Sequence, residues 1–174
     1  MADYSKASVA RPAGMPGAGL HPLNKLILID AEDIDTFPPR DADGVNVSGD
    51  ITLKTGAKAI AIYFTPGTAE VTSPSEGDRD SEGFTPTIQI SHPGNERDVR
   101  LFKSNWIGKN IIALMQYCDK DTVDIFGTPC NPLRLQVGYT GNNEANANQL
   151  TFQQDRGLDI GIYAGAIPAL DTAS

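Results

Sequence analysis

Cysteine, histidine and basic residues are scarce in this sequence of 174 residues, and each scarcity excludes a class of function. The two histidines and two cysteines do not form the closely spaced sets that hold zinc. Fourteen basic residues stand against 22 acidic ones, for a net charge of −8, which opposes tight binding to nucleic-acid phosphates or anionic lipid. Aromatic residues make up only 7% of the chain, which disfavours a carbohydrate-binding module. Trp106, the one tryptophan, is expected in the core.

Long apolar runs are also missing. None approaches the roughly 20 residues that a bilayer span requires, and the N-terminus lacks the basic start and apolar block of a signal peptide. We therefore expect no membrane insertion or export through the chain's own sequence. Without export, Cys118 and Cys130 are expected to be buried thiols in a reducing compartment rather than a disulfide.

Signatures of catalysis are absent as well. The G-x-S-x-G motif of a nucleophilic serine does not occur, and a cysteine mechanism with His92 remains a minor alternative. Gly14, Gly17 and Gly19 lie in a segment with no preceding strand or following helix, unlike a phosphate-binding loop. The carboxylate pairs occur in loops rich in proline and glycine, where solvent keeps their pKa values unsuited to acid–base chemistry. We predict that the protein is not an enzyme and uses no cofactor.

The segment 78–83 copies the first half of a calcium-binding loop, with oxygen ligands at alternate positions and Gly83 in sixth place. The glutamate required at position twelve is replaced by Gln89, and no helices are expected on either side. The segment is therefore interpreted as a solvated acidic loop, and calcium binding is the minor alternative. No other metal site is expected.

Seventeen glycines and twelve prolines favour a mainly β chain with many turns. Residues 1–22, rich in alanine, glycine and proline, are expected to form a flexible N-terminal arm that orders only on a neighbour. A single β-rich domain is expected over 23–168, followed by a short C-terminal tail, 169–174. Strands are expected at 25–29, 45–53, 58–65, 85–91, 111–118, 133–139, 149–153 and 160–166.

One helix is expected over 98–107. Val99, Phe102 and Trp106 fall on one face of it, and Gly108 provides a stop. The segment 111–118 either continues the helix or forms a buried strand, and its apolar residues after the glycine favour the strand. The clearest half-buried strand, 133–139, is expected to pair with 149–153 through a loop at 141–148.

Four groups of residues carry a resemblance to a known family. They are the run Phe126-Gly127-Thr128-Pro129-Cys130-Asn131-Pro132-Leu133-Arg134-Leu135, the loop Asn143-Glu144-Ala145-Asn146, the strand Leu150-Thr151-Phe152, and Ser91-His92-Pro93-Gly94 before the helix. Together they resemble virion structural proteins of tailed phages and prophages, most closely tail tube proteins. The resemblance covers roughly residues 24–167.

The resemblance implies a β-sandwich or β-barrel-like core with one flanking helix and long loops. It also implies a homo-oligomer, in which hexameric rings stack into a hollow tube that conducts DNA. The implied partners are other tail proteins, such as the tape measure and the terminator, and the implied location is the virion tail, assembled in the host cytoplasm. DNA would be a cargo that does not adhere, because an acidic lumen repels phosphates.

Loops of the resembling protein would supply contacts between rings. The segments 30–50 and 65–84 are acidic, and the second is expected to join two strands as a long hairpin. We expect one of these loops, with the arm, to dock on the next ring against cations of the helix, so that deleting 66–83 leaves a folded subunit that cannot polymerise. The candidate inter-subunit residues are Asp33, Asp35, Asp41, Asp43, Glu76, Asp78, Asp80, Glu82, Arg97 and Arg100.

Three other functions stay open. A tail terminator or connector would stop at a single ring, and a capsid-decorating protein would bind only a shell. A ligand-binding β-sandwich would be a monomer with an exposed aromatic or calcium site. A solvated helix face is the alternative explanation for the cations Arg97, Arg100, Lys103 and Lys109.

Overall fold

Two strands of consecutive apolar residues lie at the centre of the structure, a computed structural model that describes residues 6–171. Strand β1 (Pro22–Asp30) pairs antiparallel with β10 (Ile111–Tyr117), with Leu28 opposite Ala113. Successive side chains of a strand point to opposite faces, and both faces of this pair are covered. This explains why apolar residues follow one another in both strands.

The first sheet extends from this pair in both directions. On one side β1 pairs with β5 (Ile60–Tyr63), and on the other β10 pairs with β11 (Val123–Phe126), in the order β5-β1-β10-β11-β14-β3. The outer strands are β14 (Gly161–Tyr163) and β3 (Asn46–Val47), which are parallel to each other.

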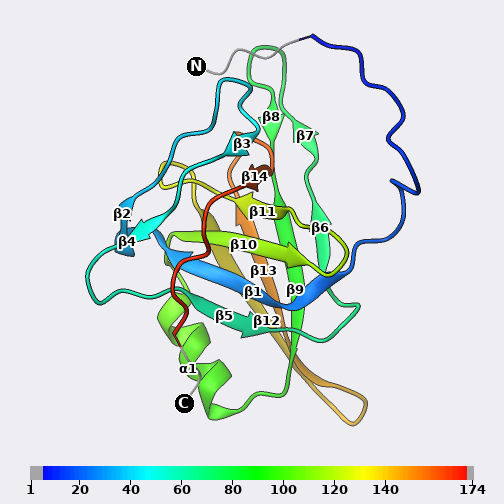
Figure 1. Ribbon diagram of the computed structural model, residues 1–174. Helices are drawn as coiled ribbons and strands as arrows, with labels where there is room; N and C mark the ends of the chain where they lie inside the picture. The colour runs from blue at the N-terminus through cyan, green and yellow to red at the C-terminus, as the bar shows by residue number, and fades with distance from the viewer. Residues whose placement is uncertain (1–5, 172–174) are drawn as a thin grey trace.

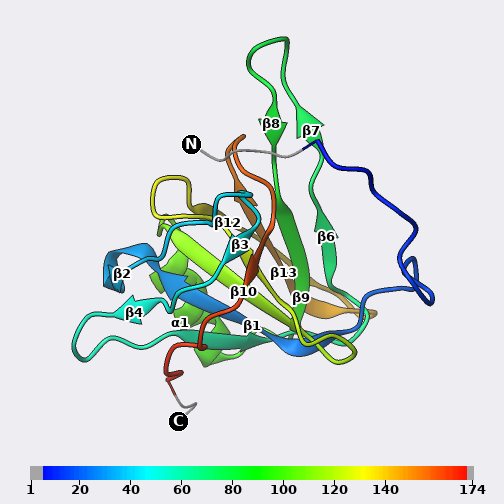
Figure 2. The same ribbon diagram turned by 45° about the horizontal axis from the view of Figure 1, so that its top comes forward.

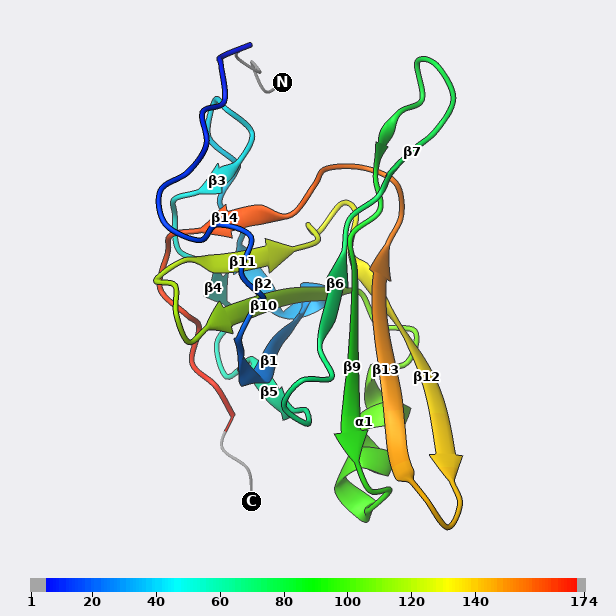
Figure 3. The ribbon, with the colours of Figure 1, turned by 90° about the vertical axis from the view of Figure 1, so that its right-hand side faces the viewer.

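These strands belong to one ten-stranded sheet, whose other part we call the second sheet: four antiparallel strands in the order β12-β13-β9-β6. Among the described strands, the two parts are joined where Leu133 of β12 pairs with Ile111 of β10. Figure 3 shows the strands of the second sheet running across the direction of the first sheet. Its members are β12 (Leu133–Gly141), β13 (Asn146–Gln154), β9 (Thr87–Pro93) and β6 (Glu70–Thr72). The chain is 43% strand and 8% helix, so the predicted mainly β, sandwich-like class with one helix is confirmed.

Each face of the first sheet has its own core. One core lies between the two sheets and contains Leu28, Ile90, Met115 and Phe152. The other lies on the opposite face, where the segment 31–59 and the end of the chain cover it. Leu170 packs there, since Ala59 N–H donates to the Ala169 carbonyl at 3.0 Å and Asp171 N–H to the Ala59 carbonyl at 2.7 Å.

Helix α1 (Arg97–Trp106) covers one end of the inter-sheet core. Phe102 and Trp106 pack against that core, with their ring centroids 6.0 Å apart. Gly108 follows with φ +76°, a left-handed conformation that glycine adopts freely, so the expected helix and its stop agree with the structure within one residue.

Short elements complete the chain. They are η1 (Ala31–Asp33), β2 (Ile34–Thr36), β4 (Thr52–Leu53), β7 (Ser75–Glu76) and β8 (Gly83–Phe84). β2 pairs with β4 and β7 with β8, each as a small separate sheet. The first lies over the second core, where Ile34 and Leu53 pack.

Several sequence expectations need correction. The strand expected over 45–53 is divided into β3 and β4, and that expected over 160–166 shortens to β14. The segment 65–84 was expected to join neighbouring strands, but β5 pairs with β1 and not with β9. Instead 70–76 folds back on 83–89 as a hairpin of its own, β6-β7 against β8-β9. Polar short strands lack the apolar periodicity from which strands are predicted.

Candidate assembly surfaces

The acidic hairpin around β7 and β8 projects beyond the body of the molecule (Figures 1 and 2). Its tip turns at Gly77, whose φ is +116°, and a Cβ there would lie 2.2 Å from the Ser81 carbonyl oxygen, so only glycine fits. Arg156 Nη1 donates to the same carbonyl at 2.9 Å. The tip is therefore shaped by backbone geometry and braced from a distant loop.

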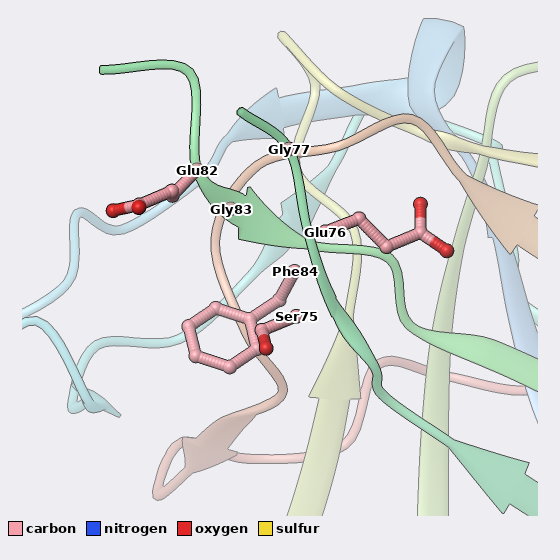
Figure 4. A pocket seen from close by; sticks show the side chains of 6 residues that line it. All are labelled: Ser75, Glu76, Gly77, Glu82, Gly83 and Phe84. Carbon is pink, nitrogen blue, oxygen red and sulfur yellow. The ribbon is translucent and has the colours of Figure 1, made fainter. Parts of the chain in front are cut away.

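Carboxylates are carried on both faces of this hairpin. Figure 4 shows Glu82 and Glu76 pointing away from it in opposite directions, with the Phe84 ring on the side of Glu82. Glu76 Oε2 accepts a hydrogen bond from Thr85 Oγ1 at 3.0 Å. Within residues 6–171, no ion pair neutralises Glu76, Asp78, Asp80 or Glu82. The structure thus gathers these four predicted residues on one projection, where four carboxylates outnumber the cations Arg79 and Arg156.

The cations of α1 lie at the opposite end of the molecule from this hairpin (Figures 1 and 3). Arg97 and its neighbour Asp98 are both highly exposed and 3.7 Å apart, an arrangement that contributes little in water. Arg100 Nε donates to the Asn95 carbonyl at 2.8 Å. The predicted acidic and basic groups are therefore not neighbours within one chain.

Asp33, Asp35, Asp41 and Asp43 lie outside the hairpin, although the loop that carries Asp41 and Asp43 reaches its base, where Val45 and Phe84 line one pocket. Asp33 ends η1 and Asp35 lies in β2, whereas the other two precede β3. Asp41 accepts hydrogen bonds from Asn46 Nδ2 at 3.0 Å and from the N–H groups of Val45 and Asn46. These bonds, that from the Asn46 side chain above all, lower the pKa of Asp41. Asp41 is thus a loop-forming residue.

The outward face of the second sheet is polar and carries little charge. Along β12, β13, β9 and β6, apolar residues point to the core and every second residue points outward. Cross-strand pairs on this face join amides to hydroxyls, as in Gln136 opposite Thr151 and Thr151 opposite Gln89. The outward residues are Glu70, Thr72, Thr87, Gln89, Ser91, Pro93, Arg134, Gln136, Gly138, Thr140, Ala147, Gln149, Thr151 and Gln153.

Lys103 plays a role that the sequence did not indicate. Its Nζ donates to Asn148 Oδ1 at 2.8 Å and to Asn95 Oδ1 at 3.1 Å, and it lies 5.5 Å from the centre of the Tyr139 ring. Asn148 is fully buried and donates to the Gly94 carbonyl at 2.7 Å. Lys103 therefore fastens α1 to the second sheet. From the sequence, Lys103 was grouped with Arg100 as a cation that faces either solvent or a partner.

Another polar pair is half-buried in the first sheet. Tyr117 Oη donates to Asp124 Oδ2 at 2.6 Å across the β10–β11 hairpin. Burial raises the pKa of Asp124, against the opposing effects of this hydrogen bond and of Lys120. Burial also raises the pKa of Tyr117, to which the Asp124 carboxylate contributes. The pair ties two strands together.

Metal and thiol expectations have different outcomes. In residues 6–171 no three histidine, cysteine or acidic side chains are grouped so as to hold a metal ion. The cysteine prediction was wrong: Cys118 and Cys130 are exposed free thiols, because both lie just beyond strand ends, in turns. No helix in the described part of the chain is long and apolar enough to span a bilayer.

Comparisons of the chain with protein-family models, curated proteins and solved structures found no match. Its function has to be inferred from its residues and their geometry.

Proposed function

We propose that this chain is the structural subunit of a phage tail tube, which polymerises as stacked hexameric rings into a hollow conduit for DNA. The observation that carries the proposal is the second sheet, with its outward face of amides and hydroxyls and its two open edges. Among the described strands, β6 pairs only with β9, and β12 beyond Leu133 pairs only with β13.

Open edges favour sheet extension between copies. Unpaired N–H and carbonyl groups of an edge strand are a template for another strand. If β6 of one copy pairs with β12 of the next, the four-stranded sheet continues from subunit to subunit, and closing the ring removes both edges. The outward-facing Gln, Thr and Ser residues of the second sheet then line the lumen.

Such a lining suits DNA passage. The outward face carries one cation, Arg134, and one carboxylate, Glu70, among the described residues. With so few cations, DNA phosphates release few counterions on contact and gain little affinity. This proposal differs from the expectation of a lumen rich in carboxylates. The acidic residues that we assign to assembly lie on the hairpin and loops, and the proposed lumenal face is polar with little charge.

Opposite charge at opposite ends supports stacking. The acidic hairpin and helix α1, which carries Arg97 and Arg100, lie at the two ends of the molecule (Figure 1). In a stack of rings, the hairpin of one subunit would face the α1 end of the subunit in the next ring. Complementary charge would set the register and polarity of the stack.

Electron microscopy of the purified full chain, together with size-exclusion chromatography over a range of concentrations, tests this function. Hollow tubes or stacked rings are expected. Single rings that do not stack would instead indicate a terminator or connector. Monomers at every concentration would contradict the proposal and favour a decorating or ligand-binding protein.

Thiol labelling then tests the orientation. In a Cys118→Ser, Cys130→Ser background, Gln149→Cys lies on the outward face of the second sheet and Ser104→Cys on the exposed side of α1. A bulky maleimide is expected to label both in monomers but to lose access to Gln149→Cys in tubes. Equal labelling of Gln149→Cys in tubes and monomers would contradict a lumenal position for this face.

A further inference from the structure

An apolar groove lies beside the base of the acidic hairpin. It encloses about 460 Å³ between three loops that are far apart in sequence. Val45, Phe84 and Leu158 line it and are 42%, 38% and 44% exposed. They are three of the seven exposed large apolar residues that the described part of the chain has outside the N-terminal arm, and the groove brings these three together. Grouped apolar exposure of this kind marks an interaction site.

The walls of the groove are held in place before anything binds. Phe84 and Gly157 exchange two backbone hydrogen bonds, each 2.9 Å long. Arg40 donates to the Asp159 carbonyl at 2.7 Å and to the Gly44 carbonyl at 3.1 Å. These bonds fix all three loops, so an occupant would meet a preformed surface and little ordering cost.

The rim of the groove carries carboxylates. Glu82 stands on the same side of the hairpin as Phe84 (Figure 4), and Asp159 lies on the opposite wall. The Asp159 carboxylate accepts from Ser73 Oγ and from the Ile160 N–H. Arg40 also lines the groove, so the lining carries two carboxylates and one cation. An occupant with apolar side chains and positive charge would therefore fit.

The arm of this protein has that composition. Every residue over 6–21 is exposed, and Val9 and Met15 are 94% and 87% exposed. Lys6 and Arg11 are its charged residues, and the segment holds no carboxylate. Prolines after Arg11 and Met15 favour extended backbone at these two residues. A turn follows Met15, where Ala18 N–H donates to the Met15 carbonyl at 3.1 Å.

We propose that the arm of one copy, residues 6–21, docks in this groove of a second copy. Val9 and Met15 cover the apolar floor formed by Phe84 and Leu158, and Arg11 lies between the rim carboxylates Glu82 and Asp159. The identity of the occupant rests on the proposed self-assembly, whereas the groove, its charge and the composition of the arm do not.

Disulfide trapping between copies tests the docking. In the Cys118→Ser, Cys130→Ser background, one preparation carries Ala13→Cys in the arm and the other, with an affinity tag of different mass, carries Val45→Cys in the groove. Mild oxidation of the mixture should give a mixed dimer of intermediate mass. The matched control replaces Val45→Cys by Ser104→Cys on α1, and we expect about tenfold less mixed dimer, since docking raises the effective concentration only near the groove.

Two further variants test which contacts hold the arm in the groove. Arg11→Glu and Leu158→Asp should each reduce the mixed dimer to the level of the control, because one reverses the charge of the arm and the other adds charge to the apolar floor. Equal trapping at Val45→Cys and Ser104→Cys overturns the proposal. So does trapping only when both cysteines lie in one chain, which would place the arm on its own domain.

Failure of the docking and failure of the proposed function give different results. Normal tubes without the mixed dimer would refute the docking alone. A specific mixed dimer from a protein that never forms rings or tubes would refute the tube and support the docking.

Discussion

At the residue scale, the polar side chains that matter most for stability are those that are buried or half-buried. Lys103 and Asn148 satisfy each other between α1 and the second sheet, and Tyr117 and Asp124 do so between β10 and β11. A buried polar group without its partner costs more than the bond contributes. Single substitutions at these two pairs should therefore lower the free energy of unfolding of the whole domain.

Lys103→Met tests the first pair. The substitution keeps the aliphatic stem but leaves the buried Asn148 Oδ1 without its donor, and we expect the free energy of unfolding to fall by about 1–3 kcal/mol. Urea unfolding measures it. Arg97→Met, on the exposed side of the same helix, should change stability by less than about 0.5 kcal/mol. Similar losses in both variants would refute a fastening role for Lys103.

Asp124→Asn tests the second pair through its pH dependence. Because the pKa of Asp124 is raised in the folded state, the folded chain holds this proton at higher pH than the unfolded chain does. The resulting stabilisation is present at acid pH and is lost as pH rises from the unfolded pKa through the raised folded one.

Asparagine keeps an acceptor for Tyr117 and does not titrate. Urea unfolding between about pH 4 and pH 7 should therefore show Asp124→Asn gaining stability relative to the parent as pH rises. A difference that is constant with pH, or that moves in favour of the parent, would contradict this account.

At the scale of elements, the hairpin around β7 and β8 divides into a part that builds the fold and a part that projects. β6 pairs with β9 and Val71 packs on the core, so deleting 66–83 would remove a strand of the second sheet as well as the tip. A deletion that tests assembly without damaging the second sheet must therefore be confined to the hairpin tip.

Replacing residues 77–82 by Asn-Gly should separate folding from assembly. Glu76 and Gly83 are paired opposite each other, and a two-residue Asn-Gly turn closes such a hairpin. Circular dichroism and urea unfolding should match the parent, whereas rings should no longer stack in electron micrographs. Normal tubes from this variant would show that the tip is not needed.

A second variant, with a tip of full length and the substitutions Asp78→Asn and Glu82→Gln, separates the effect of the charge of the tip from that of its shape.

At the scale of the whole molecule, the hairpin carries four carboxylates at one end, and α1 carries Arg97, Arg100 and Lys103 beside Glu96 and Asp98 at the other. The arrangement makes no contact within one chain, so its consequences belong to pairs of molecules. Charges at an interface act mainly on specificity and association rate and are screened by salt. Stacking should accordingly be weakened by salt more than ring closure, which depends on strand pairing.

A charge exchange tests this arrangement. Arg97→Glu with Arg100→Glu should prevent stacking, and so should Asp78→Lys with Asp80→Asn; asparagine is chosen at 80 because φ there is +70°. Combining both sets should restore tubes, as seen by electron microscopy. Asp121→Lys, on an exposed turn of the first sheet, should leave stacking unchanged. Absence of rescue would show that the two ends do not meet.

Local patterns in the sequence predicted the long elements. The alternation at 133–139 predicted β12 and its pairing with β13, and the apolar spacing before Gly108 predicted α1. The apolar run at 25–29 predicted a strand, and that at 111–118 favoured a buried strand over a continued helix; both are strands, β1 and β10. In each case burial imposes a periodicity on neighbouring residues, so the pattern can be read without knowledge of the fold.

Only the tertiary structure decided what depends on residues far apart in the chain. It placed the acidic tip and the α1 cations at opposite ends, turned Lys103 inward onto Asn148, left both cysteines exposed, and joined Val45, Phe84 and Leu158 in one groove. Composition set the class of the fold through its turns and its apolar periods. These placements arise from pairings between strands remote in sequence, and no local pattern encodes which remote segment becomes a neighbour.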